Sequence, residues 1–346
     1  MNSYIRLMRL NRPIGSFLLL WPTYWALFLS ADGWPDIDLL IIFSLGVIVM
    51  RSAGCVINDY ADRDIDKHIK RTQNRPITSG EISSRSALIL FVILLLVALI
   101  LVLQTNLLTI QLSLIAAGLA TIYPFTKRWT NLPQLVLGAA FGMSVPMAFA
   151  AQTGTITSEA GLIFLASLVW TLIYDTLYAM ADRDEDLKIG LKSTAILFKS
   201  YDHVVITILQ VALILLFVGI GNSFNLGQIF YFSLIIIACL MIYHQFLMKK
   251  PIQLHIIIVR LIHFPRVQNW VLVLSLNLKY LLVLVLELLF PPPTEPEPLP
   301  PPPVSTTDSN TTASTFKFPP SSIFSSFSSS FIDAVVEEMM LFLAQL

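Results

Sequence analysis

Two clusters of polar and acidic side chains carry the most evident chemistry in this sequence. The first runs from Asn58 to Asp66, and the second runs from Asp182 to Asp186. On a helix, Asn58, Asp62 and Asp66 would recur at every fourth position and share one face, as would Asp182 and Asp186. Two such faces that approach each other would suit Mg²⁺, because this ion prefers carboxylate oxygens and bridges them to phosphates. The pattern predicts magnesium-assisted binding of a diphosphate.

The same spacing separates the candidate ligands from their acidic neighbours. Asp64, Asp184 and Glu185 fall outside the four-residue repeat, so we expect these three side chains to lie on the surface. The competing interpretation of both clusters is a solvated acidic cap that binds no ligand. We favour a metal site because the two clusters share their spacing and each follows an apolar stretch of the chain.

Two arginines near the first cluster are candidate phosphate-binding residues. Arg51 lies seven residues before Asn58, on the same helical face, within an apolar stretch where a charge is costly and usually functional. Arg75 follows the cluster and could reach a diphosphate through bidentate hydrogen bonds. The alternatives are that Arg51 extends along the helix to reach water and that Arg75 only sets the membrane topology.

A third motif closes the apolar stretch that ends near residue 123. It contains Tyr123, Lys127 and Arg128. Lys127 suits a phosphate as a point charge, whereas the planar guanidinium of Arg128 suits a carboxylate. The alternative is that these residues only anchor a helix at the membrane interface, where Tyr, Lys and Arg are common.

Membrane-spanning helices must position these residues. Of the 346 residues, 55% are hydrophobic and 13% are charged, and the mean hydropathy is +0.74, whereas soluble domains carry about 25% charged residues. Apolar runs long enough to cross a ~30 Å hydrocarbon layer recur along the chain. The sequence predicts an all-α, polytopic transmembrane helical bundle with spans at 14–31, 38–56, 86–104, 107–123, 132–151, 160–180, 203–221 and 225–247, and a ninth between 270 and 290.

The charges between the spans predict their orientation. Connectors 57–85, 124–131 and 181–202 contain Lys and Arg, whereas the connectors on the other side contain none, at 32–37, 105–106, 152–159 and 222–224. By the positive-inside rule, the N-terminus and the basic connectors face the cytoplasm, so the acidic clusters do too. We interpret 14–31 as a retained span and not as a cleaved signal peptide, because it is long and no clear cleavage site follows.

The remaining composition excludes several other classes. The formal net charge is zero, which gives no electrostatic footprint for nucleic acid. Cys55 and Cys239 lie within apolar runs, so we expect neither a disulfide framework nor a redox pair. The five histidines show no metal-binding spacing, so any metal must be held by carboxylates. Nothing in the sequence indicates an oligomeric state.

The last part of the chain differs in composition from the rest. We predict an intramembrane domain over residues 1–290 and a Pro/Ser-rich tail over residues 291–346. The tail cannot bury enough apolar area to offset its ordering entropy, so we expect it to be disordered. Residues 331–346 could form a short amphipathic helix.

These motifs together resemble those of the UbiA superfamily of intramembrane aromatic prenyltransferases. The flanking segments Arg12-Pro13-Ile14-Gly15 and Lys188-Ile189-Gly190 are similar to the bacterial branch that prenylates 4-hydroxybenzoate, and the resemblance is dense from about residue 4 to residue 250. The superfamily's two aspartate motifs and its Tyr/Lys motif match Asn58-Asp59-x-x-Asp62-x-x-x-Asp66, Asp182-x-x-x-Asp186 and Tyr123-x-x-x-Lys127.

The resemblance implies about nine transmembrane helices around a central cavity with a cytoplasmic cap, in a bacterial inner membrane. It also implies transfer of a polyprenyl group from polyprenyl diphosphate to the carbon ortho to the hydroxyl of 4-hydroxybenzoate, in ubiquinone biosynthesis. The implied cofactor is Mg²⁺, with Asn58, Asp59, Asp62, Asp66, Asp182 and Asp186 as metal ligands. Asp59 is included on the resemblance alone.

The resemblance also implies roles for the neighbouring side chains. Arg128 would pair with the benzoate carboxylate, and an aspartate of the second motif could assist the phenol proton. The implied catalytic residues are Asp62, Asp66, Asp182, Asp186 and Lys127. The implied substrate-binding residues are Arg51, Asn58, Arg75, Tyr123 and Arg128.

Alternatives remain for the prenyl acceptor, for the class of protein and for the origin of the C-terminal part of the chain. A menaquinone, haem O or chlorophyll type of transferase would share the aspartate motifs and differ in the acceptor pocket. A cation transporter is disfavoured, because transport sites usually lie at the bilayer midplane. After about Lys250 the chain departs from the superfamily pattern, for which a reading-frame change and a genuine extension are the two explanations.

Overall fold

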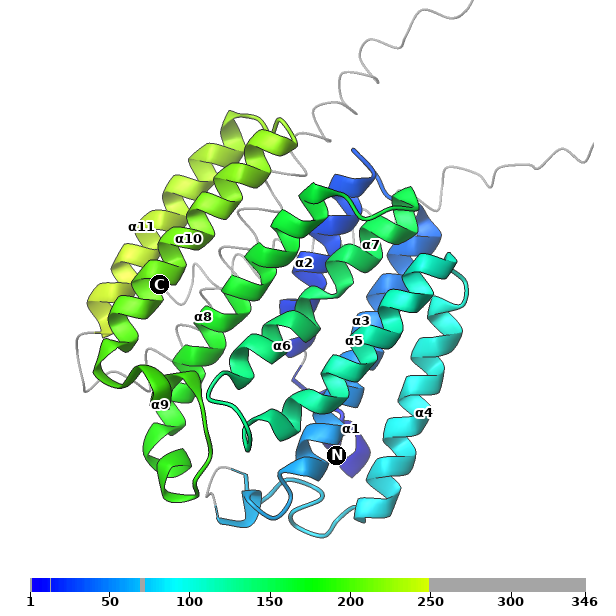
Figure 1. Ribbon diagram of the computed structural model, residues 1–346. Coiled ribbons are helices and arrows are strands. Elements are labelled where there is room, and N and C mark those ends of the chain that lie inside the picture. Colours follow the sequence, from blue (N-terminus) through cyan, green and yellow to red (C-terminus); the bar gives the residue numbers. More distant parts are fainter. Residues whose placement is uncertain (1, 13, 69–71, 249–346) are drawn as a thin grey trace, which may run out of the picture. The chain divides into compact units, whose positions relative to one another are not determined.

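The computed structural model describes residues 2–12, 14–68 and 72–248, and every statement about structure refers to these residues. The predicted span at 270–290, the tail at 291–346 and the short helix at 331–346 lie outside them. All regular elements in the described part are helices (Figure 1). They are α1 Ser3–Leu7, α2 Ile14–Ser30, α3 Ile37–Ala61, η1 Asp66–His68, α4 Ser84–Val102, α5 Leu107–Thr126, α6 Pro133–Gly142, α7 Ser144–Thr153, α8 Ser158–Lys188, α9 Thr194–Phe198, η2 Lys199–Tyr201, α10 Asp202–Ser223 and α11 Gln228–Met248.

Each of the eight spans predicted within these residues coincides with helical structure. Seven helical segments are long and apolar enough to cross a membrane by length and composition. The remaining predicted span, 14–31, corresponds to α2, which is apolar but only 17 residues long. The prediction of an all-α, polytopic membrane bundle is therefore confirmed.

Several spans begin where a polar side chain satisfies the first free backbone N–H groups of a helix. Ser83 accepts a hydrogen bond from the Ser86 N–H at 3.1 Å before α4, and Asn106 accepts one from the Thr109 N–H at 2.9 Å before α5. Such N-caps stabilise a helix by about 1 kcal/mol each. Short polar connectors thus set the helix boundaries.

The predicted span at 132–151 is divided into two helices. Pro146 has no N–H to donate to the carbonyl of Gly142, and its ring crowds that carbonyl, so the helix breaks near Met143. Before the break, α6 packs closely on α8. A Cβ atom built on Gly138 would lie 3.0 Å from the carbonyl oxygen of Leu168, so glycine permits this close approach.

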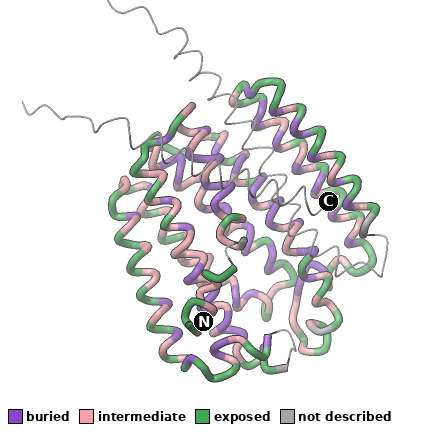
Figure 2. Tube along the Cα trace, turned by 180° about the vertical axis from the view of Figure 1, so that it is seen from behind, coloured by how far each residue is buried: buried purple, intermediate pink, exposed green. Residues whose placement is uncertain are grey.

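Aromatic side chains fill the core between the helices. The ring of Trp25 in α2 lies 5.9 Å from that of Trp170 in α8 and 5.7 Å from that of Phe217 in α10. A second apolar cluster joins α1, α3 and α4, with Leu7 and Ala53 fully buried. Figure 2 shows buried positions between the helices and exposed positions along their outward faces. Many of these exposed side chains are large and apolar, as expected for surfaces that contact lipid.

The first acidic cluster departs from the predicted helical register. Helix α3 ends at Ala61, Asp62 is its C-cap, and Asp66 begins the short helix η1. Asn58, Asp62 and Asp66 therefore do not share one continuous helical face, and that prediction is wrong. Backbone N–H groups of Ile65 and Asp66 both donate to the Asp62 carbonyl, at 2.9 and 2.8 Å, so the chain turns there. The second cluster, by contrast, lies on the uninterrupted helix α8.

Candidate active site

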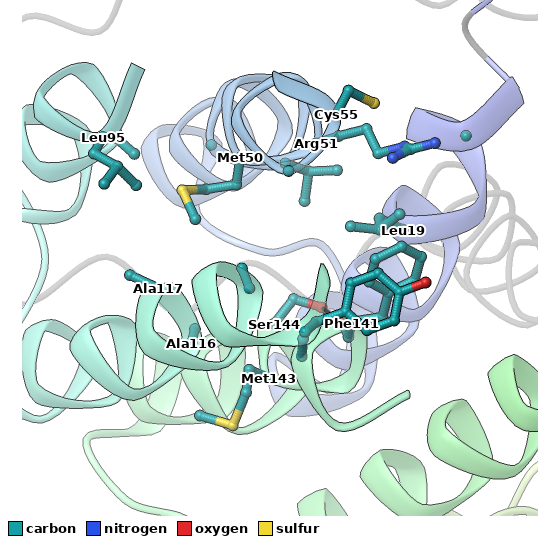
Figure 3. A pocket seen from close by; sticks show the side chains of 18 of the residues that line it. Leu19, Met50, Arg51, Cys55, Leu95, Ala116, Ala117, Phe141, Met143 and Ser144 are labelled. Atoms are coloured by element: carbon teal, nitrogen blue, oxygen red, sulfur yellow. Dashed lines mark hydrogen bonds between the residues drawn. The ribbon is translucent and has the colours of Figure 1, made fainter. Parts of the chain in front are cut away.

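A cavity of about 820 Å³ lies within the bundle. Side chains from α2 to α8 line it, and most of its wall is apolar, including Leu19, Met50, Leu95, Phe141 and Met143 (Figure 3). Its charged lining is concentrated toward the end where α1 and the connectors after α3 and α5 lie (Figure 1). The polar lining residues there include Arg9, Arg12, Arg51, Asn58, Asp59, Arg75, Tyr123, Lys127 and Asp175.

Lys127 joins the cavity to the first aspartate cluster. Its ammonium lies 3.4 Å from a carboxylate oxygen of Asp62, although the two residues are 65 positions apart in the sequence. Burial alone would lower the pKa of Lys127, but the hydroxyl of Tyr123 and the carboxylates of Asp62, Asp175 and Asp186 outweigh this effect and raise it. The charged form of Lys127 is therefore favoured, and carboxylates of both aspartate clusters contribute to this.

Two arginines hold the carboxylate of Asp59. Arg9 donates to Asp59 at 2.8 Å, and Arg75 lies 3.1 Å from the same carboxylate oxygen. Arg75 also bonds to Asp66 at 2.7 Å. Because the Asp59 side chain is fully buried, this network fixes the N-terminal segment and the connector after α3 against α3. Asp59 was expected to be a metal ligand from resemblance alone, and in this structure its carboxylate pairs with two guanidinium groups.

Asp62 and Asp66 are almost completely buried, with 6% and 3% of their surface exposed. Burial raises the pKa of Asp66, and the charge of Arg75 opposes the rise. Asp64, by contrast, has 69% of its side chain exposed and pairs with Lys67 at 3.1 Å. Asp184 is exposed as well. The expected division between inward carboxylates and surface neighbours therefore holds at these positions.

The second cluster lies at the end of α8, near the connector that follows α5. Asp182 and Asp186 are half-buried, and Asp186 contributes to the electrostatic environment of Lys127. Past this end of α8, the backbone N–H of Lys192 donates to the carbonyl of Lys127 at 3.0 Å. The Lys192 ammonium also donates to the carbonyl of Trp129 at 3.2 Å. These bonds brace two distant connectors against each other at one end of the bundle.

The donor set fits Mg²⁺ that is shared with phosphate oxygens. Within the described ranges, no three His, Cys, Asp or Glu side chains converge closely enough to hold a metal ion by themselves. Mg²⁺ usually keeps several waters and is bound through one or two carboxylates plus substrate phosphates. Asp62, Asp66, Asp182 and Asp186 supply carboxylates of that kind, and Lys127 and Arg75 supply the cations that a diphosphate would also require.

Arg51, expected to bind phosphate, and Arg128, expected to bind a carboxylate, are placed differently. Arg51 lines the cavity (Figure 3), and its guanidinium lies close to Gly15 in α2. A Cβ atom on Gly15 would lie 2.6 Å from Nε and 2.7 Å from Nη2 of Arg51. Arg128 is not among the described residues that line the cavity. It donates to the carbonyl of Ala61 at 2.6 Å and lies over the ring of Phe125 at 5.8 Å.

Asp175 is a cavity residue that lies outside both aspartate motifs. It lies seven residues before Asp182 on α8 and lines the cavity together with Tyr174 and Tyr178. A sequence signal was available, because an aspartate inside the predicted span 160–180 is costly in a membrane and therefore a functional candidate. The four-residue register of the acidic clusters did not include it.

The fold and the site define a polytopic membrane protein in which an apolar cavity ends in a cluster of carboxylates and cations. The chain belongs to the UbiA prenyltransferase family, whose family model matches residues 19–254. This assignment confirms the resemblance inferred from the motifs.

Several bacterial proteins named 4-hydroxybenzoate octaprenyltransferase are similar to this chain. A 4-hydroxybenzoate octaprenyltransferase of Vesicomyosocius okutanii is 60% identical over 243 residues, which cover 70% of this chain and 89% of that protein. A 4-hydroxybenzoate octaprenyltransferase of Vibrio cholerae is 55% identical over 248 residues, which cover 72% of this chain and 87% of that protein.

Solved structures share the fold at lower identity. The apo structure of a UbiA homologue from Aeropyrum pernix K1 superposes with a TM-score of 0.67 at 23% identity, covering 76% of this chain and 97% of that one. A UbiA homologue from Archaeoglobus fulgidus, bound to GPP and Mg²⁺, superposes with a TM-score of 0.58 at 18% identity, covering 78% of this chain and 99% of that one. These similarities support the helical bundle.

Proposed function

We propose that this protein transfers a polyprenyl group from polyprenyl diphosphate to 4-hydroxybenzoate, at the ring carbon ortho to the hydroxyl, as a step of ubiquinone biosynthesis. The observation that carries the proposal is an apolar cavity that ends in carboxylates and cations, in a chain 60% identical to a 4-hydroxybenzoate octaprenyltransferase. An isoprenoid chain needs the apolar wall, and a diphosphate needs the charged end.

The donor diphosphate would bind between the two aspartate clusters. Asn58, Asp62, Asp66, Asp182 and Asp186 would hold Mg²⁺, which when bound neutralises the diphosphate and promotes its departure. Lys127 and Arg75 lie beside Asp62 and Asp66 and would stabilise the charge of the leaving group through preorganised donors. Tyr123, one turn before Lys127, lines the cavity near the reacting end of the donor.

Arg51 is the better candidate for the carboxylate of the aromatic acceptor. It lines the cavity, whereas Arg128 is bonded to the Ala61 carbonyl and does not. A guanidinium binds a carboxylate with two parallel hydrogen bonds, which would also orient the ring. The apolar surroundings exclude water, and this protects an allylic cation from hydrolysis.

The site would open to the cytoplasm from a bacterial inner membrane. This placement is supported by the connectors after α3, α5 and α8, which carry Lys and Arg, whereas those after α2, α4, α7 and α10 carry none. We also propose that residues 1–290 form the catalytic domain and that residues 291–346 are an appended tail. The family match ends at residue 254, well before the tail.

A transfer assay tests the proposal directly. Membranes containing the full chain, or a chain truncated after residue 290, would be incubated with Mg²⁺, a polyprenyl diphosphate and either 4-hydroxybenzoate or a different aromatic acceptor such as a naphthoate. We expect prenylated 4-hydroxybenzoate from both proteins, and no product when a chelator removes Mg²⁺. Turnover of only the other acceptor would overturn the assignment of 4-hydroxybenzoate.

A further inference from the structure

Asp175 places a carboxylate in the wall of the cavity, within the membrane-spanning part of α8. It lies seven residues before Asp182, which is two helical turns, so both residues share one face of α8. A carboxylate at such a depth in the membrane costs free energy, and such residues usually have a function. Its position therefore calls for a function that is separate from that of the two aspartate motifs.

Within the described part of the chain, Asp175 forms no hydrogen bond or ion pair. Its electrostatic environment includes Lys127 and Arg51, which are cations, and Asp182, which is an anion. Asp175 also interacts electrostatically with Tyr123. A polar group in an apolar wall that lacks a direct partner is normally costly. A ligand in the cavity could supply that missing partner.

The acceptor offers a suitable donor, if the proposed function holds. With its carboxylate on Arg51, the aromatic ring would lie inside the cavity that Asp175 lines, with its hydroxyl at the opposite end of the molecule. Asp182 and Asp186 are not among the described residues that line the cavity. Carboxylates that bind Mg²⁺ are also weak bases, because the metal withdraws their charge. This argues against the expectation that an aspartate of the second motif removes the proton of the phenol hydroxyl.

We propose that Asp175 is a catalytic residue that accepts the hydroxyl proton of the aromatic acceptor as the new carbon–carbon bond forms. The allylic C–O bond breaks, and its electron pair leaves with the diphosphate. The ring carbon ortho to the hydroxyl donates an electron pair to the allylic carbon while the hydroxyl proton moves to Asp175. The dienone that results loses its ring proton to the released diphosphate, and Asp175 returns its own proton to the oxygen.

The alternative role for Asp175 is to hold Lys127 in place for the donor. The two roles differ in which substrate is affected. A proton acceptor matters less when the acceptor hydroxyl is already acidic, whereas a positioning partner of Lys127 would affect donor binding with every acceptor. An isosteric substitution and two acceptors of different acidity separate the two roles.

The test compares Asp175→Asn, Asp175→Glu and the wild-type full chain in membranes with Mg²⁺ and one polyprenyl diphosphate. The matched control is Asp184→Asn, which makes the same change at an exposed position of the same helix. The acceptors are 4-hydroxybenzoate and 3-fluoro-4-hydroxybenzoate, whose hydroxyl is more acidic. For each protein, kcat and both KM values are measured.

We expect Asp175→Asn to reduce kcat with 4-hydroxybenzoate by about 10²–10⁴-fold, with the KM for the diphosphate unchanged. The loss should be smaller with the fluorinated acceptor, because its more acidic hydroxyl depends less on a proton acceptor. Asp175→Glu should recover part of the activity, and Asp184→Asn should resemble the wild type. If Asp175→Asn does not assemble, the same comparison is made with Asp175→Glu, whose displaced carboxylate should lower kcat more with 4-hydroxybenzoate than with the fluorinated acceptor and leave the KM for the diphosphate unchanged.

Three results would overturn the role of Asp175. These are an equal loss with both acceptors, a raised KM for the diphosphate, or near-normal activity of Asp175→Asn. Wild-type membranes that prenylate neither benzoate would instead contradict the proposed function. The two failures are therefore distinguished by the wild-type reaction.

Discussion

The ammonium of Lys127 lies 3.4 Å from the carboxylate of Asp62, which brings the end of α5 to the end of α3. Lys127 also lines the apolar cavity. This single pair therefore connects the space for an isoprenoid chain with the carboxylates that would bind its diphosphate through Mg²⁺.

Replacing a motif carboxylate should abolish transfer without affecting insertion into the membrane. We expect Asp62→Ala and Asp182→Ala each to reduce product to the level seen with a chelator, because the polar ends of spans do not drive insertion. Transfer is measured in membranes with equal amounts of each protein. Asp64→Ala is the control, since Asp64 is exposed and pairs with Arg63 and Lys67 at the surface. Near-normal activity of both Asp62→Ala and Asp182→Ala would refute the magnesium site.

The two arginines should differ in their effect on the aromatic acceptor. Hydrogen bonds to charged groups contribute about 1.5–3 kcal/mol, so Arg51→Gln should raise the KM for 4-hydroxybenzoate about tenfold to a hundredfold. Arg128→Gln should change it little, because Arg128 is bonded to the Ala61 carbonyl outside the cavity wall. A steady-state titration of the acceptor at saturating diphosphate provides the comparison. A larger rise of the KM in Arg128→Gln than in Arg51→Gln would instead identify Arg128 as the residue that binds the acceptor carboxylate.

A methyl group at position 15 should displace the guanidinium of Arg51. The added Cβ of Gly15→Ala would lie 2.6 Å from Nε of Arg51, which is closer than such atoms approach in folded proteins. We expect a raised KM for the acceptor, in the same direction as Arg51→Gln and smaller, with the protein still folded. Gly118→Ala is the matched control, because nothing lies within 4 Å of the added atom. Equal kinetics of the two alanine variants would contradict this role for Gly15.

The attachment of α1 should depend on the ionisation of Glu81. Hydrogen bonds from Ser3 and Arg6 lower the pKa of Glu81 below its usual value of 4.5. The charged form is thus favoured when α1 is docked. The stabilisation is fully present above that value and is lost as the pH falls through the lowered pKa.

At neutral pH, Glu81→Gln should reproduce this loss. We expect hydrogen exchange in residues 3–8 to become severalfold faster, a modest change because exposed ion pairs contribute little. Exchange mass spectrometry in detergent or nanodiscs measures it. Glu159→Gln, at the opposite end of the bundle and away from α1, serves as the control. Unchanged exchange in Glu81→Gln would show that α1 is held without Glu81, by the contacts of Leu7 and Arg9 and by the hydrogen bond from Arg6 to the Asn74 carbonyl.

Sequence reasoning succeeded where the relevant interactions are local. The spans were predicted because apolar length is set by bilayer thickness, and the described boundaries fall near polar caps such as Ser83 and Asn106. The second cluster was placed correctly on one helix, since Asp182 and Asp186 lie within α8. The exposure of Asp64 followed from the same periodicity, even though the first cluster proved not to be one helix.

Periodicity failed where a helix stopped or where distant segments met. The residues near Asp62 contain no local signal that α3 ends at Ala61. The turn that follows is fixed by contacts such as that between Arg75 and Asp66. The break in the span at 132–151 did have a local signal in Pro146. The prediction of a single uninterrupted helix there overlooked it.

The sequence by itself determined the membrane bundle, the family motifs and the side on which the charges gather. Only the tertiary structure decided that Asp59 pairs with Arg9, fifty positions away, that Arg51 rather than Arg128 lines the cavity, and that Asp175 joins it. Local periodicity reports which face of a helix a residue occupies. It does not report which other helix that face meets, because such contacts arise from packing of segments that are remote in the chain.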